Sequence, residues 1–188
     1  MAARGVRGAT LAAIAEHSGA PVGSIYYRFG SVDELLARLW LRAVRRSHAA
    51  LERAGAAADP VQRAVGCALA VYDFCLDERE DALLLATFSR RDLRASMLSP
   101  ELRAALEHVN EPIERPFAEL AHELFPSSDR AGLDLALLAV VDIPYGFARR
   151  HVEAGTRPPA ARRGAVEAAV RAIVAIGRLK PTGPEEDL

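Results

Sequence analysis

The stretch that decides the fold lies near the N-terminus and reads Thr10-Leu-Ala-Ala-Ile-Ala-Glu-His-Ser-Gly-Ala-Pro-Val-Gly-Ser-Ile-Tyr-Tyr-Arg-Phe-Gly30. Thr10 is suited to cap a first helix, and Gly19 follows that helix where a left-handed conformation is favoured. Pro21 fixes φ for the start of a second helix. Ile25 and Phe29, four residues apart, form the inner side of this helix. The spacing predicts a helix-turn-helix unit.

The outer face of the second helix carries small and hydrogen-bonding side chains, namely Val22, Gly23, Ser24, Tyr26, Tyr27 and Arg28. Gly23 and Ser24 have little bulk and can approach base edges in a DNA groove. The tyrosine hydroxyls and the guanidinium of Arg28 suit phosphate oxygens. A helical hairpin with a polar face and no nucleic acid has the same spacing, so the residues alone leave both interpretations open.

The segment resembles the DNA-binding head of the tetracycline-repressor (TetR) family. The matching positions are Thr10, Leu11, Ile14, Ala15, Gly19, Pro21, Gly23, Ser24, Ile25, Tyr26, Arg28, Phe29, Ser31, Asp33 and Leu35. The resemblance implies that Val22, Gly23 and Ser24 meet bases, that Tyr26, Tyr27 and Arg28 grip the DNA backbone, and that Thr10 belongs to the same DNA-binding set. It also implies a repressor that a small-molecule effector releases from double-stranded operator DNA.

The family has a full helix before this motif, whereas nine residues precede Thr10 in this chain. Met1–Gly5 resembles the last turn of that helix, so we expect a DNA-binding head that lacks most of its first helix. The competing function is a ligand-binding helical dimer that has lost DNA binding for this reason.

Composition favours an all-α fold, because alanine and leucine dominate and aromatic residues make up 6% of the chain. Residues 1–50 hold 7 arginines against 3 carboxylates, and the remainder holds 17 basic against 22 acidic residues. This asymmetry suits a small polyanion-binding module on an acidic body. We therefore expect a DNA-binding domain over residues 1–47, an effector-binding and dimerisation domain over 48–180, and a tail over 181–188.

Capping signals divide the body into helices. Ser31 and Glu34 form the pattern of a capping box before a helix that runs to about Arg53. Further helices are expected over 60–76, 80–88, 100–125, 129–154 and 161–179, with a kink or break in 100–125 at Pro112 and Pro116.

The two last helices predict a homodimer. Leu133–Phe147 is apolar almost all round and is expected to be buried on every side. The final helix is rich in alanine, valine and isoleucine, which permits close approach of another helix. Such a pair is typical of half of a four-helix subunit interface. Two interior helices of a monomer are the alternative.

Polar or aromatic residues within apolar stretches are the candidates for effector binding: Tyr72, Cys75, Phe88, His108, Asp142 and Tyr145. A buried carboxylate at Asp142 would need a partner, which is either an arginine or a ligand. Pro144 frees a backbone carbonyl near Val140, which favours a polar niche there.

Other functions find little support in the sequence. The five histidines have no metal-ligand spacing, and the chain contains neither a nucleophile elbow nor a phosphate loop. We therefore expect no enzyme activity, no metal and no cofactor. The longest apolar run, Leu135–Val141, is far shorter than a membrane span. A cytoplasmic protein without membrane contact is expected.

Overall fold

The computed structural model describes residues 16, 19, 21–94, 97–126, 130–157, 159 and 161–178, and every regular element in those ranges is helical. The elements are α3 (Val22–Phe29), α4 (Val32–Ala54), α5 (Pro60–Asp77), α6 (Arg79–Thr87), α7 (Arg90–Arg94), α8 (Pro100–Glu107), α9 (Glu111–Leu124), α10 (Arg130–Leu137), the π-helix η1 (Leu138–Asp142), α11 (Ile143–Ala154) and α12 (Ala161–Arg178). The all-α prediction is confirmed. The expected domain boundary after residue 47 falls inside α4, which is continuous there.

The helix ends follow local chemistry. Ser31 Oγ accepts a hydrogen bond from the Glu34 N–H at 3.1 Å and caps α4. The predicted capping box is only half formed, because the Glu34 carboxylate accepts instead from the backbone N–H of Ser99, at 2.9 Å. Asp59 caps α5 by accepting from the N–H of Gln62. Gly155 ends α11 with φ +73°, a conformation that residues with a side chain rarely adopt.

The predicted helix over 100–125 is broken, as its prolines require, but the break precedes them. α8 ends at Glu107, and Pro112 lies in the first turn of α9, where a backbone N–H would have no intrahelical acceptor, so its absence in proline costs no hydrogen bond. Pro116 stands inside α9. It has no N–H, so the carbonyl of Pro112, one turn earlier, lacks its intrahelical donor.

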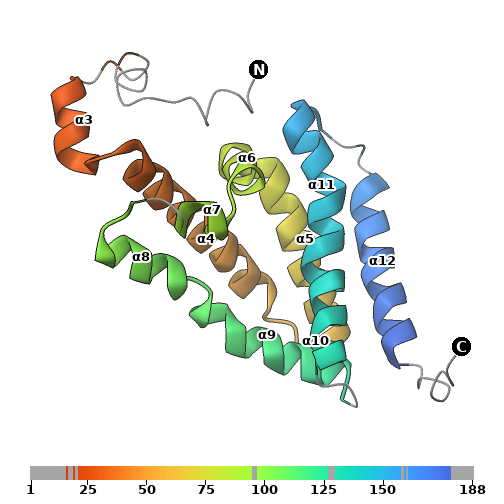
Figure 1. The fold of residues 1–188 in the computed structure, drawn as a ribbon. Helices are drawn as coiled ribbons and strands as arrows, with labels where there is room; N and C mark the ends of the chain where they lie inside the picture. The colour runs from red at the N-terminus through yellow and green to blue at the C-terminus, as the bar shows by residue number, and fades with distance from the viewer. Residues whose placement is uncertain are drawn as a thin grey trace, which may run out of the picture.

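Three apolar clusters hold the helices together, and the helices that carry them follow one another from α3 towards α12 (Figure 1). The smallest holds α3 against α4 through Ile25 and Leu35. The second packs Trp40 of α4 against α7 and α8 and includes Leu102 and Leu106. The largest is built around α5, which packs against α4, α11 and α12. Since α4 contributes to all three clusters, it is the element that joins α3 to the body.

Within the single chain, Leu133–Phe147 is buried on one side only, so the expected burial on every side would need a partner subunit. Ala136, Ala139 and Val140 are buried, whereas Leu133, Leu137 and Leu138 are more than a third exposed. The run Arg130–Ala154 is long and apolar enough to cross a membrane by length and composition. Its inner side packs against α5 and α12, which is how a helix packs in a helical bundle.

Candidate nucleic-acid interface and effector cavity

The exposed surface of α3 holds the residues with DNA-binding chemistry. Val22, Gly23, Ser24, Tyr26, Tyr27 and Arg28 are all exposed, and Tyr27 is 95% exposed. The Pro21 carbonyl accepts from the N–H of Ser24 at 3.0 Å and of Ile25 at 3.3 Å, which closes the first turn of the helix. Gly19 has φ +68°, the left-handed conformation expected at the turn before α3. Thr10 lies outside the described residues.

The inner side of α3 fixes the direction of this surface. Ile25 is buried against Leu35 of α4, with Phe29, Val32 and Leu39 packed around the pair. The guanidinium of Arg28 lies 5.6 Å from the centroid of the Phe29 ring and remains exposed. A cation, two phenol hydroxyl groups and two small residues therefore share one short helix, a set that can contact both phosphates and base edges.

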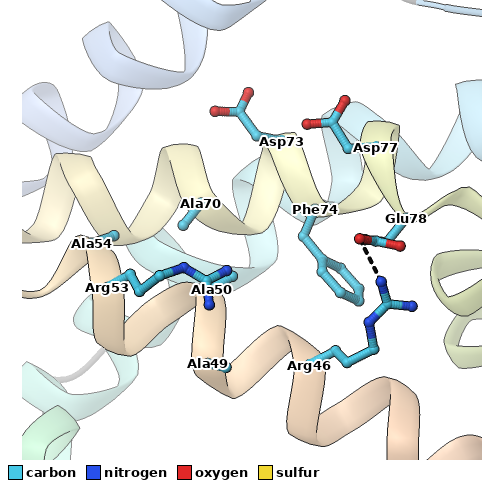
Figure 2. Close-up of a pocket in the computed structure, with 10 residues that line it drawn as sticks. All are labelled: Arg46, Ala49, Ala50, Arg53, Ala54, Ala70, Asp73, Phe74, Asp77 and Glu78. Carbon is cyan, nitrogen blue, oxygen red and sulfur yellow. Dashed lines mark ion pairs between the residues drawn. The ribbon is translucent and has the colours of Figure 1, made fainter.

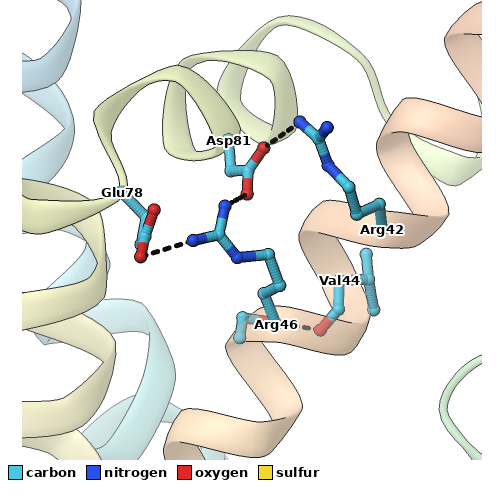
Figure 3. A network of polar contacts seen from close by, with 6 residues as sticks. Arg42, Val44, Arg46, Glu78 and Asp81 are labelled. Carbon is cyan, nitrogen blue, oxygen red and sulfur yellow. Dashed lines mark hydrogen bonds and ion pairs between the residues drawn. The ribbon is translucent and has the colours of Figure 1, made fainter.

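Two other arginines of the basic N-terminal segment are bound to the body (Figure 3). Asp81 at the start of α6 is 2% exposed and accepts from Arg42 at 2.9 Å and from Arg46 at 2.6 Å. Arg46 also pairs with Glu78. These ion pairs hold α4 against α6. They also neutralise two arginines whose positive charge, judged from composition, was expected to be available for binding a polyanion. Sequence reasoning missed Asp81, because an acidic residue in the first turn of a helix looks like ordinary dipole compensation.

The six predicted effector residues do not form one site. Tyr72 and Cys75 are buried in the α5 core, and Tyr145 is half-buried against the same cluster. Burial raises the pKa of the Cys75 thiol to about 12 and also raises the pKa of Tyr145. The aromatic ring of Phe88 packs in the second cluster, where its carbonyl accepts from the indole N–H of Trp40 at 2.9 Å.

Two of the six lie at the surface. His108 is exposed and contacts the carboxylate of Glu111. Asp142 is exposed as well, which corrects the expectation of a buried carboxylate in need of a partner. The π-turn over Leu138–Asp142 and the unburied side of this helix bring Asp142 to the outside.

A groove of about 640 Å³ runs between α4 and α5. Its floor is formed by alanines and Phe74, and charged side chains stand along both edges (Figure 2). Arg46 and Glu78 pair across one end, and Asp73 pairs with Arg163 of α12 at 3.1 Å. Three of the five charged side chains that line the groove are therefore already paired within the protein.

A smaller cavity of about 280 Å³ lies between α4, α5, α9 and η1, and none of the six predicted effector residues lines it. Its walls are mainly apolar and include Cys67, Phe117 and Val140. Pro112 and Pro116 also line it. The two prolines stand in one five-residue stretch of α9. They were the signal in the sequence that could have indicated an irregular helix wall at this cavity.

Comparison with known proteins adds one finding. Residues 1–39 match the sequence model of a family described as bacterial regulatory proteins, tetR family. No curated protein matches the chain. The matched segment includes α3 and its support by the first turns of α4.

Proposed function

We propose that this chain, whose residues 1–39 match the tetR family of bacterial regulatory proteins, is a DNA-binding transcriptional regulator of that family. We propose further that it is a cytoplasmic repressor that a small-molecule effector releases from its operator. The observation that carries the DNA-binding role is the exposed face of α3, with Ser24, Tyr26, Tyr27 and Arg28 supported from behind by Ile25. We assign base contacts to Val22, Gly23 and Ser24, and phosphate contacts to the tyrosines and Arg28.

The repressor acts as a homodimer through α10–η1–α11 and α12. Leu133, Leu137 and Leu138 are exposed on the first of these, and Ile176 of α12 is 66% exposed. α10 and α12 pack together, so these side chains belong to neighbouring helices (Figure 1). An exposed apolar surface of this kind on a monomer is typical of a subunit interface. Two α3 helices, one from each subunit, then read two half-sites.

Salt-dependent DNA binding tests the assignment. Binding to operator DNA selected from a random duplex pool is measured by fluorescence anisotropy at several salt concentrations. Because each phosphate contact releases about 0.9 counterion, Arg28→Ala in both subunits should reduce the log–log salt slope by about 2 on every sequence. Ser24→Ala should instead relax base preference with little change of slope.

Arg53→Ala is the matched control, since it removes the same charge at the end of α4 remote from α3. Its slope should equal that of the wild type. A chain that dimerises but shows no sequence-selective DNA binding would contradict the repressor function and favour a ligand-binding dimer.

A further inference from the structure

The carboxylate of Glu34 joins the DNA-binding head to the body. Glu34 lies in the first turn of α4, directly before Leu35, which supports α3. Its carboxylate accepts a hydrogen bond from the backbone N–H of Ser99, the cap residue of α8, at 2.9 Å. Leu98, next to Ser99, belongs with Trp40 of α4 to the second apolar cluster. The hydrogen bond therefore lies where α8 packs on α4, and a shift of α8 along α4 breaks it.

This hydrogen bond engages an ionised carboxylate. The backbone N–H of Ser99 is the main cause that lowers the pKa of Glu34; partial burial opposes the shift, and the hydroxyl of Ser99 and the guanidinium of Arg38 add to it. Arg38 lies 3.5 Å from the other carboxylate oxygen. Glu34 is therefore negatively charged at neutral pH, and its hydrogen bond from Ser99 belongs to the stronger, charge-assisted kind.

A second donor competes for the same carboxylate. In a complete capping box Glu34 would accept from the N–H of Ser31, whose hydroxyl already caps α4. That N–H donates instead to the carbonyl of Phe29 at 2.8 Å, across Gly30 with φ +70° and ψ −57°. A three-residue turn with positive φ at its centre is the strained form of the γ-turn. The N–H of Ser31 thus has a poor acceptor, and the capping box offers it a better one.

The position of the carboxylate sets the charge beside the DNA-binding surface. Ser31 follows Arg28 by three residues, and Arg28 is assigned above to a phosphate contact. The N-terminus of α4 carries the positive end of the helix dipole, which favours an anion such as a phosphate. A carboxylate that turns from α8 to the N–H of Ser31 brings its negative charge closer to this end and to Arg28. DNA binding is weakened as a result.

We propose that Glu34 is a two-position switch between the body and the DNA-binding head. With the N–H of Ser99 as donor, the carboxylate is held at α8 and the head is competent to bind DNA. When α8 moves away from α4, the carboxylate closes the capping box on the N–H of Ser31 and opposes DNA binding. The effect on DNA rests on the proposed function, whereas the exchange of hydrogen-bond donors does not depend on it.

Ser99→Pro removes the body's donor and leaves the carboxylate free. The backbone of Ser99, with φ −59° and ψ 152°, already suits proline, and its side chain makes no cap hydrogen bond to α8. Amide proton shifts of the isotope-labelled protein are followed by NMR while the pH is lowered from about 7 to about 3.5, through the titration of Glu34. In the wild type the amide of Ser99 should follow that titration. In Ser99→Pro the amide of Ser31 should follow it instead.

Operator affinity of the same variants is measured by fluorescence anisotropy at one salt concentration. Ser99→Pro should bind about threefold to thirtyfold more weakly than the wild type, the effect of one charge brought to a helix N-terminus in each of two subunits. Ser99→Ala is the matched control, because it keeps the N–H and loses only the hydroxyl, and it should bind as the wild type does. Glu34→Gln added to Ser99→Pro should restore the affinity, because a neutral amide carries no charge to the N-terminus of α4.

Glu34→Asp tests the switch without a change at Ser99. Its side chain is one methylene too short for the contact with Ser99 but still suits a capping box, so it should behave as Ser99→Pro does. If the amide of Ser31 ignores the carboxylate in both folded variants, the exchange of donors is overturned. An unchanged DNA affinity in these variants, or a loss in Ser99→Pro that Glu34→Gln does not restore, overturns the switch. A wild-type protein that binds no DNA contradicts the proposed function, and the amide titration alone then decides the exchange.

Discussion

Replacing Asp81 by asparagine should destabilise the protein more than removing any other single ion-paired charge described above. Asp81 is 2% exposed and its two carboxylate oxygens accept from Arg42 and Arg46. An amide keeps one acceptor oxygen and presents an NH2 group to the second guanidinium, so one hydrogen bond is lost and a donor faces a donor. A hydrogen bond to a charged group contributes about 1.5–3 kcal/mol.

The arginines moderate the loss. Their side chains are 57% and 46% exposed, so either guanidinium can turn towards water instead of remaining buried and unpaired. This places the expected loss at about 2 kcal/mol, below the 3–5 kcal/mol that is typical when a fully buried ion pair loses one partner. Urea unfolding followed by far-UV circular dichroism measures the loss, at a fixed protein concentration because a dimer gains stability with concentration.

Glu80→Gln is the matched control for Asp81→Asn. Both residues lie in the first turn of α6, so both changes remove one negative charge from the same helix N-terminus. Glu80 is exposed, and its variant should stay within about 0.5 kcal/mol of the wild type. If the two variants unfold at the same urea concentration, the contacts with α4 contribute nothing measurable and the reasoning fails.

Three further predictions concern other parts of the body. Burial lowers the pKa of His48 below its ordinary 6.5, so the unfolded chain binds more protons and stability should fall as the pH drops from about 7 to about 5.5; His48→Leu should flatten that part of the stability–pH curve, and an unchanged curve would refute the assignment. Leu137→Glu should convert the proposed dimer to a monomer in light scattering, while Met97→Glu, at a position 91% exposed and outside the proposed interface, should not. Burial raises the pKa of Cys75 to about 12 and also raises that of Cys67, so neither thiol should react with a disulfide reagent near neutral pH until the protein is denatured; rapid labelling of the native protein would contradict their burial.

Helix ends in this chain were predictable because the residues that set them act locally. Ser31, Asp59 and Gly155 each satisfy or terminate a helix through groups within a few residues, and each stands where the sequence predicts. The inner and outer sides of α3 likewise follow from the period of a helix alone. Local chemistry and periodicity were sufficient for these features.

Features that depend on a distant partner were not predictable. In a capping box the carboxylate of Glu34 would accept a hydrogen bond from the backbone N–H of Ser31. It accepts instead from the N–H of Ser99, 65 residues away. Asp81 draws its partners from 35 and 39 residues back along the chain. Asp142 was expected inside because its neighbours are apolar, yet this helix carries apolar residues on its exposed side as well. The single sequence does not distinguish the two sides.

The length of α4 has a mechanical consequence. Its 23 residues make a rod of about 34 Å, with the cavity wall at Leu51 near one end and the support of α3 at Leu35 near the other. A tilt of about 5° about the cavity end displaces the other end by about 3 Å, close to the rise of one base pair. If the two subunits of the proposed dimer tilt in opposite directions, the separation of their α3 helices changes by about two base-pair steps. A displacement of that size takes paired recognition helices out of register with half-sites spaced by one helical turn of DNA.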